Sequence, residues 1–261
     1  MKQFILESEP DKENNVRLEG GDYHYLVRVR RLAVGEFFPA LLPNGEETSI
    51  QILSIENNIL TGKCTIPQKN TGLNLKSNTL PPIILFQAMP KSDKMDLIVR
   101  QAAEGGITEI VPFLSEFSFA KAVSSEKQKF IRWERIIKEA RQQSGSKITT
   151  LLKPTLTMNE LFEYWHKIKS SGSLGLLFHH TPAKGLEQNS LHGYLNNNPD
   201  VVALVIGPEG GFSEKEATFF LKNDFRLITV GDTVLRTETA ALYCSAAIRI
   251  LLLERDSWEK K

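Results

Sequence analysis

The sequence is poor in cysteine and has no long apolar run. Of its 261 residues only two are cysteines, Cys64 and Cys244, and no motif surrounds either of them. This rules out a disulfide framework and a cysteine-based zinc site, so we expect reduced thiols. No apolar stretch approaches the roughly 18 residues of a membrane-spanning helix, and the first residues turn acidic too early for a secretory signal. These absences predict a cytoplasmic protein with no membrane partner.

An excess of charge of one sign is also missing. There are 32 Lys and Arg residues against 31 Asp and Glu residues, which gives a formal net charge of +1. A dedicated non-specific nucleic-acid binder is usually more basic, so any RNA contact must come from local clusters of charge.

Several well-known catalytic and binding motifs are absent as well. The sequence has no GxGxxG, GxxxxGK[ST], GxSxG or HExxH motif, which argues against dinucleotide binding, nucleotide hydrolysis, serine hydrolysis and zinc proteolysis. The pair His179-His180 has no third ligand at a suitable spacing, so we expect no metal.

The first 75 residues have the pattern of a small β-barrel. Short apolar stretches at residues 36–42, 49–55 and 59–65 are separated by turn signals at Asn44-Gly45 and Asn57-Asn58. One short helix is expected at residues 22–30, and a polar stretch at residues 67–82 is typical of a linker.

Residues 76–261 alternate short apolar runs with helical segments. This alternation predicts an α/β domain with a parallel sheet. The expected strands lie at residues 83–88, 107–113, 174–178, 201–206 and 227–230. The expected helices lie at residues 93–104, 126–144, 159–169, 214–223 and 239–254.

Two loops of the second domain carry the strongest functional signals. The first loop, residues 207–211, reads GPEGG and follows a β-branched strand, at the edge of a parallel sheet where ligands bind. The second loop, residues 230–236, reads VGDTVLR and runs into the next helix with Arg236 and Glu238 at its mouth. Taken alone, the first loop is either a ligand-binding turn or a tight strand-to-helix connection. Arg236 and Glu238 are either substrate contacts or a surface ion pair.

Together the two loops resemble the ribosomal RNA small subunit methyltransferase E family, within the SPOUT superfamily. The motif GPEGGFSxxE, followed by VGxxVLRTETA, carries the resemblance together with MPKxDKMD at residues 89–96 and the segments at residues 101–104 and 139–144. The resemblance extends from about His24 to Leu252. It implies a C-terminal SPOUT domain with a trefoil knot and an N-terminal PUA-like β-barrel that binds RNA. It also implies a homodimer that uses S-adenosylmethionine to methylate N3 of a uridine in 16S ribosomal RNA of the small subunit.

The resemblance also assigns residues to roles. The implied catalytic residues are Arg236 and Glu238. The implied cofactor-binding residues are Leu177, Phe178, Gly207, Glu209, Gly210, Val230, Gly231, Val234 and Leu235. The expected RNA-binding residues are His24, Arg28, Arg30 and Arg31, where arginines would contact phosphates; a solvated helix face is the alternative.

The chain departs from the family at positions that usually carry arginine. Phe117 stands at one of them, and Ser146 and Lys147 at another. These changes remove bidentate phosphate donors and leave two further interpretations open. One is a non-catalytic RNA-binding or ribosome-assembly protein of the same fold, and the other is a ribose 2′-O-methyltransferase.

The resemblance also suggests a division of labour in methyl transfer. We expect the Arg236 cation to stabilise charge on the uracil carbonyl oxygens as N3 loses its proton. Glu238 or a water molecule would accept that proton.

Overall fold

The protein forms two compact units. The structure is a computed structural model that describes residues 4–65, 80–91, 93–118, 126–180 and 190–258. One unit comprises residues 1–76 together with 141–149, and the other comprises residues 77–140 and 150–261. No pattern in the sequence predicts that residues 141–149 group with the N-terminal unit. The linker expected at residues 67–82 lies mostly outside the described residues.

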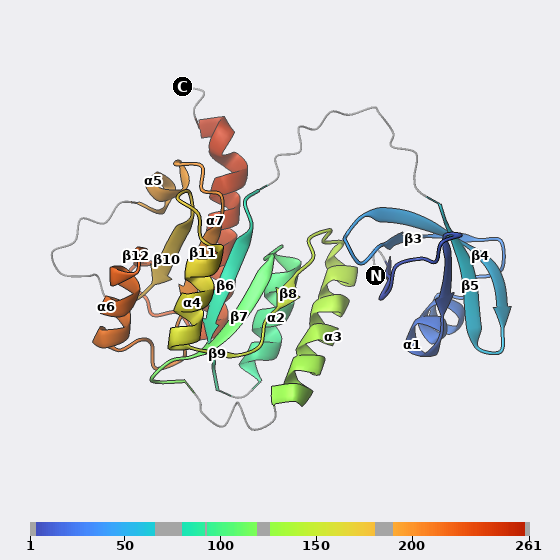
Figure 1. The fold of residues 1–261 in the computed structure, drawn as a ribbon, viewed down its shortest axis with the longest axis horizontal. Coiled ribbons are helices and arrows are strands. Elements are labelled where there is room, and N and C mark those ends of the chain that lie inside the picture. Colours follow the sequence, from blue (N-terminus) through green and yellow to red (C-terminus); the bar gives the residue numbers. More distant parts are fainter. Residues whose placement is uncertain (1–3, 66–79, 92, 119–125, 181–189, 259–261) are drawn as a thin grey trace. The chain divides into compact units, whose positions relative to one another are not determined.

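The first unit is built on a five-stranded sheet (Figure 1). Its strands are β1 (Phe4–Ile5), β2 (Asn15–Leu18), β3 (Phe37–Leu41), β4 (Glu47–Glu56) and β5 (Ile59–Thr65). Their order is β1-β3-β4-β5-β2, with β1 parallel to β3 and the other neighbours antiparallel. The sheet encloses an apolar core in which Phe38, Ile50 and Leu60 are fully buried.

Both predicted turns of this unit are confirmed. Asn57 and Asn58 have φ values of 50° and 60°, and they join Glu56 of β4 to its partner Ile59 of β5. Two consecutive left-handed residues make a type I′ turn, whose twist matches that of a hairpin. Gly45, with φ of 90°, lies in the connection between β3 and β4.

The helix expected at residues 22–30 is present but has a different form. It begins as α1 (Gly20–Tyr23) and continues as one widened turn, the π-helix η1 (His24–Val29). The N–H of Arg30 donates to the carbonyl of Tyr25 at 2.9 Å, which is an i to i−5 bond. Arg31, with φ of 58°, then ends the helix. Apolar spacing does not distinguish a single π turn from an α turn.

The second unit contains a parallel seven-stranded sheet, so the predicted α/β class is confirmed. The strands are β6 (Ile83–Ala88), β7 (Glu109–Leu114), β8 (Leu151–Leu152), β9 (Leu156–Thr157), β10 (Leu174–Phe178), β11 (Val202–Ile206) and β12 (Phe225–Ile228). Their order is β12-β10-β11-β6-β7-β8, and β9 also pairs with β7. All the pairings are parallel.

Helices cover both faces of this sheet (Figure 1). They are α2 (Lys94–Glu104), α3 (Glu126–Ser144), α4 (Met158–Ile168), α5 (Leu191–Leu195), α6 (Glu214–Lys222) and α7 (Thr237–Trp258). Apolar residues of α2, α3, α5 and α7 share one core cluster with the sheet, and those of α4 and α6 share the other. Successive residues of β6 alternate between the clusters, because strand side chains point to opposite faces. Both sheet faces are therefore buried.

Some predicted boundaries were wrong. The last strand spans Phe225–Ile228 instead of residues 227–230, so Thr229 and Val230 belong to the loop that follows. The strand predicted at residues 107–113 begins at Glu109. The elements β1, β2, β8, β9 and α5, which have two to five residues, were not predicted, because their sequences carry too little periodicity.

Candidate functional site

A cavity of about 310 Å³ lies where β10 and β11 end and the second loop begins. This is the carboxyl edge of the parallel sheet, where open α/β folds bind their ligands. The volume is at the lower end of the range of about 300–1,000 Å³ that is usual for small-molecule sites. Apolar walls come from Phe178, Ile206, Val234, Leu235, Ala240 and Cys244, and polar groups come from Lys94, His179, His180, Glu209 and Arg236.

The first loop turns sharply because of its glycines. The N–H of Gly211 donates to the carbonyl of Pro208 at 2.9 Å, and Gly211 has φ of 70°. A Cβ atom added to Gly210 would lie 2.9 Å from the Cβ of Phe117, so a larger residue requires one of them to move. Ser213 and Glu216 then form the capping box that starts α6. The backbone of the loop is therefore held at the rim of the cavity.

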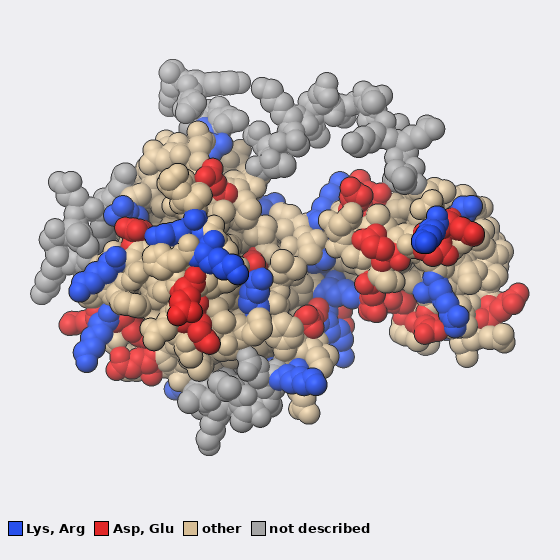
Figure 2. All heavy atoms as spheres, viewed as in Figure 1, with Lys and Arg blue, Asp and Glu red and all other residues tan. Residues whose placement is uncertain are grey.

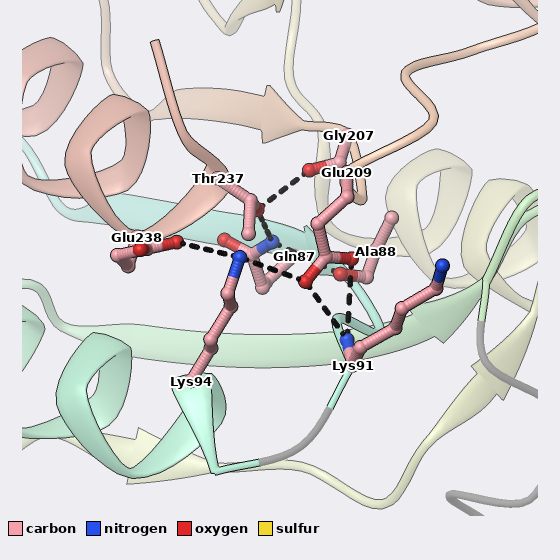
Figure 3. Close-up of polar contacts among 8 residues, drawn as sticks. All are labelled: Gln87, Ala88, Lys91, Lys94, Gly207, Glu209, Thr237 and Glu238. Carbon is pink, nitrogen blue, oxygen red and sulfur yellow. Dashed lines mark hydrogen bonds and ion pairs between the residues drawn. The ribbon is translucent and has the colours of Figure 1, made fainter.

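Thr237 joins the first loop to the start of α7. Its hydroxyl donates to the carbonyl of Gly207 at 2.7 Å and accepts from the Nε2 of Gln87 at 3.0 Å. Gln87 is fully buried at the end of β6, and Thr237 is buried at the N-terminus of α7. These bonds connect β6, the first loop and the start of α7 (Figure 3). Residues of both predicted loops line one cavity.

A second link is ionic. The Nζ atom of Lys94 lies 3.0 Å from Oε1 of Glu209 and 3.3 Å from Oε2 of Glu238. The backbone N–H of Lys91 donates to both carboxylate oxygens of Glu209, at 3.1 and 3.2 Å. Figure 3 shows Lys94 between the two carboxylates. One cation thus contacts an acidic residue of the first loop and another in the first turn of α7.

The same contacts shift two pKa values. Burial raises the pKa of the Glu209 carboxyl, but hydrogen bonds from backbone N–H groups and from Lys94 outweigh burial and hold this pKa below its usual value. The hydrogen bond to Glu209, with a smaller one to Glu238, raises the pKa of Lys94 despite partial desolvation. Both groups are therefore charged near neutral pH.

Most of the residues that the family resemblance assigned to the cofactor site line this cavity. They are Phe178, Gly207, Glu209, Gly210, Val230, Val234 and Leu235, and the expected catalytic residue Arg236 joins them. Gly231 lies beside the lining residues and has φ of 63°. Glu238 is not among the lining residues, but it forms an ion pair with Lys94, which is one of them. The cofactor and catalytic roles stay predictions.

Leu177 does not fit its expected place. Its side chain is fully buried in the core cluster on the α4 and α6 side of the sheet, whereas Phe178 belongs to the opposite cluster and lines the cavity. Because strand residues alternate between faces, two neighbours cannot both point to the cavity. Only backbone atoms of Leu177 remain candidates for a ligand contact.

The sequence did not assign several residues that line the cavity or support it. Lys94 and Gln87 precede the loops by more than a hundred residues, and only the motif at residues 89–96 hinted at the importance of this region. His179 and His180 stack with ring centroids 4.6 Å apart, and both line the cavity. Within the described part of the chain, no group of three or more His, Cys, Asp or Glu residues is placed to hold a metal ion.

The expected RNA-binding residues share one exposed stretch of the first unit. His24 and Arg28 lie on η1, Arg30 and Arg31 follow it, and all four are exposed. Figure 2 shows basic and acidic side chains interspersed over the visible face, which fits the small net charge. A role in RNA binding therefore depends on such local clusters.

The residues at the replaced arginine positions have contacts of their own. Phe117 packs beside Gly210 of the first loop. Lys147 lies in the first unit and forms an ion pair of 2.8 Å with Glu47. None of the helices in the described ranges is both long and apolar enough to cross a membrane.

Comparison with known proteins identifies the family. A family model described as RNA methyltransferase domain matches residues 76–249. The chain is 30% identical to ribosomal RNA small subunit methyltransferase E 2 of Borreliella burgdorferi, over 97% of this chain and 98% of that protein. It is 25% identical to ribosomal RNA small subunit methyltransferase E of Bacillus subtilis, over 95% of this chain and 96% of the relative.

Solved structures agree on the fold. The crystal structure of ribosomal RNA small subunit methyltransferase E from Neisseria gonorrhoeae bound to S-adenosyl methionine superposes with a TM-score of 0.75, at 22% identity, over 96% of this chain and 98% of that one. A probable rRNA-methyltransferase from Porphyromonas gingivalis gives a TM-score of 0.76 at 22% identity, over 97% and 99% of the two chains. With two thirds of its length matched by the family model and nearly all of it by a relative at 30% identity, this chain belongs to the ribosomal RNA small subunit methyltransferase E family.

Proposed function

We propose that this protein transfers a methyl group from S-adenosylmethionine to N3 of a uridine in 16S ribosomal RNA of the small subunit. The observation that carries the proposal is the meeting of the two loops around one cavity, with Arg236 in its lining. The names of the relatives support the rRNA substrate. Such a substrate places the reaction in the cytoplasm.

The cavity has the chemistry that this cofactor requires. S-adenosylmethionine combines a flat base, a ribose and a charged amino-acid end. Apolar walls from Phe178, Ile206 and Leu235 suit the base, and backbone groups of the glycine-bearing first loop can approach the polar parts closely. A side chain at Gly210 would meet Phe117 and disturb this loop. When bound, the cofactor supplies an electrophilic methyl group on a sulfonium.

The residues around the cavity can prepare the uridine. N3 carries a proton at neutral pH, and its loss spreads negative charge onto the two neighbouring carbonyl oxygens. Arg236 is a permanent cation in the cavity lining and can stabilise that charge. Glu238, held by Lys94, is placed to orient the substrate or to accept the proton directly or through water.

The first unit would hold the RNA. We assign to it the PUA-like role, with His24, Arg28, Arg30 and Arg31 contacting phosphates, because these side chains share one exposed stretch. Such contacts position the RNA without selecting its sequence. The selection of the uridine would then depend on the cavity of the second unit.

We also propose the trefoil knot of the family for the second unit and a homodimer built on α7. Four large apolar side chains of this helix, Leu242, Tyr243, Ile250 and Leu253, are between 40% and 56% exposed. They fall within about 100° of one another on a helix of 3.6 residues per turn. An apolar stripe of this kind on a soluble protein marks a contact surface.

Nucleoside analysis of ribosomal RNA tests the proposal. Small-subunit RNA from a deletion strain should lack one 3-methyluridine that the parent strain has, and the gene supplied on a plasmid should restore it. Loss of a 2′-O-methyl nucleoside would assign the chain to ribose methylation. No change in any methylated nucleoside would leave a non-catalytic role in RNA binding or ribosome assembly.

A further inference from the structure

Lys94 occupies a position that helix electrostatics do not favour. It is the first residue of α2, where the positive end of the helix dipole disfavours a cation. Its side chain leaves the helix and ends between Glu209 and Glu238, with 30% of its surface exposed against 23% and 15% for the two acids (Figure 3). Two carboxylates at one ammonium offset the unfavourable position.

The two acidic residues differ in how else they are held. Glu209 also accepts from the N–H of Lys91, and its loop is further tied by the bond from Thr237 to Gly207. For Glu238, the Nζ atom of Lys94 is the one charged partner among the residues that the structure describes. Loss of Lys94 would therefore leave the first loop anchored and free the carboxylate of Glu238, which the nearby Glu209 would then repel.

We infer that Lys94 is a positioning residue for methyl transfer, acting through Glu238. Its ammonium bridges Glu209 of the first loop and Glu238 of α7, and this holds the direction of the Glu238 carboxylate. The catalytic consequence rests on the proposed function, while the ionic clamp itself does not. The inference requires that loss of Lys94 lowers turnover more than it weakens cofactor binding.

Three variants test whether Lys94 affects turnover more than cofactor binding. They are Lys94→Met, Lys94→Arg and the control Lys222→Met, which removes an exposed lysine at the end of α6. Small subunits from the deletion strain serve as substrate, and calorimetry gives the Kd for S-adenosylmethionine. For Lys94→Met we expect kcat to fall roughly 10- to 100-fold, the cost of a slightly misplaced group, with a Kd within about threefold of wild type. Lys94→Arg should restore most of kcat, and Lys222→Met should match wild type.

A double variant shows whether Lys94 acts through Glu238. If it does, Lys94→Met combined with Glu238→Gln should be no slower than the slower single variant. Full turnover in Lys94→Met, multiplicative losses in the double variant, or equal losses of kcat and cofactor binding would each overturn the inference. A wild-type protein that neither binds the cofactor nor methylates would instead remove the proposed function. Thermal unfolding of the wild type, Lys94→Met, Glu238→Gln and the double variant would still report the coupling of Lys94 to Glu238.

A separate observation concerns the surface of the first unit. Between Arg28 and Phe37 the chain exposes three arginines and three large apolar side chains, with Val29, Val34 and Phe37 at 59%, 58% and 57% exposure. Phe37 points outward from β3 while Phe38 fills the core. The N–H of Glu36 donates to the carbonyl of Ala33, so residues 33–36 form a turn that contains Val34 and ends just before β3.

We propose that Phe37 stacks on an unpaired RNA base beside phosphates held by the arginines. Aromatic faces next to arginines are the usual platform for single-stranded RNA, because every base offers a flat face. Exposed Leu53 of the same unit lies instead in a hollow lined by Glu7, Glu9 and Asp11, which would repel a phosphate backbone. The proposal deepens the RNA-binding role assigned to the first unit.

Fluorescence anisotropy with a labelled single-stranded RNA tests this on the full chain. Phe37→Ala should weaken binding roughly tenfold, the usual effect of losing one stacked base, while Phe37→Trp keeps it. Leu53→Ala is the matched control and should bind as wild type. Normal binding by Phe37→Ala, or an equal loss in Leu53→Ala, would overturn the platform and leave the RNA-binding role intact. Absence of RNA binding by the wild type would contradict that role itself.

Discussion

The ion pairs of Lys94 with Glu209 and Glu238 make the stability of the site depend on pH. The pKa of Glu209 lies below its ordinary 4.5, and the pKa of Lys94 lies above its ordinary 10.5. The stability that Glu209 contributes is fully present above the pKa that its carboxyl has in the unfolded chain. It is lost as the pH falls through the lower pKa of the folded protein. The stability that Lys94 contributes is fully present below the pKa that its ammonium has in the unfolded chain. It is lost as the pH rises through the higher pKa of the folded protein.

The clamp should therefore stabilise the fold over a limited pH range. We expect Lys94→Met to lower the free energy of unfolding by about 1 kcal/mol near pH 7, in line with partly exposed ion pairs. The difference from wild type should be largest between about pH 5 and pH 10 and should shrink on both sides. Thermal denaturation across pH measures it, and a difference that stays constant from pH 3 to pH 11 would contradict the role of the ion pairs.

Arg236 should matter for turnover and little for cofactor affinity. A permanent cation that stabilises charge only as N3 loses its proton acts mainly on the transition state. For Arg236→Ala we expect kcat to fall about 10²- to 10³-fold, with nearly unchanged binding of S-adenosylmethionine. Arg226→Ala, at an exposed arginine of β12, serves as the control. Full turnover by Arg236→Ala would remove the electrostatic role.

Cys244 should be unreactive although it lines the cavity. Burial raises the pKa of its thiol to about 12, so the nucleophilic thiolate is scarce at neutral pH. We expect iodoacetamide to modify Cys244 slowly in the native protein at pH 8 and rapidly after unfolding in urea. Mass spectrometry of the peptide that contains Cys244 reports this, and rapid native labelling would show an exposed or activated thiol.

At the scale of secondary-structure elements, capping ties the first loop to the helix that follows. The carboxylate of Glu216 accepts from the N–H of Ser213 at 3.0 Å and from the N–H of Glu116 at 2.8 Å. One side chain thus completes the capping box of α6 and holds the segment that carries Phe117, which packs against Gly210.

Removing these caps should have graded effects. Ser213→Ala should cost about 1 kcal/mol of unfolding free energy, the usual value of an N-cap, and Glu216→Ala should cost more because two N–H groups lose their acceptor. Thr157→Ala removes the equivalent cap of α4 and should cost a similar amount without weakening cofactor binding. Urea denaturation measures the unfolding free energies, and calorimetry measures cofactor binding. If all three variants bound the cofactor equally well, the capping of α6 would have no effect on the cofactor site.

The sequence predicted long elements well and short ones poorly. Strands 83–88 and 174–178 and helix 126–144 match the structure residue for residue, because apolar or helical runs and nearby proline or glycine residues mark their ends. The π turn at His24 and strands of two residues such as β8 leave no periodic pattern. The two loops could be found from their glycines, whereas Lys94 and Gln87 join the site only through tertiary contacts that no local pattern encodes.

At the scale of the whole molecule, the apolar stripe on α7 bears on assembly. Tyr243→Arg places a charge in the middle of the proposed dimer contact and should produce a monomer, since an unpaired buried charge is costly. Ile131→Arg, at a 60% exposed position of α3, is the control and should leave the dimer intact. Sedimentation velocity distinguishes the two states. A dimeric Tyr243→Arg variant, or a monomeric wild type, would rule out the proposed contact.

We propose that residues 207–211 and 230–236 form one binding site for S-adenosylmethionine. A crystal structure of the chain grown with this cofactor tests it most directly. We expect density for the cofactor between the two loops, in contact with both of them and with the apolar wall that includes Phe178. Cofactor bound elsewhere, or in contact with only one of the loops, would contradict it.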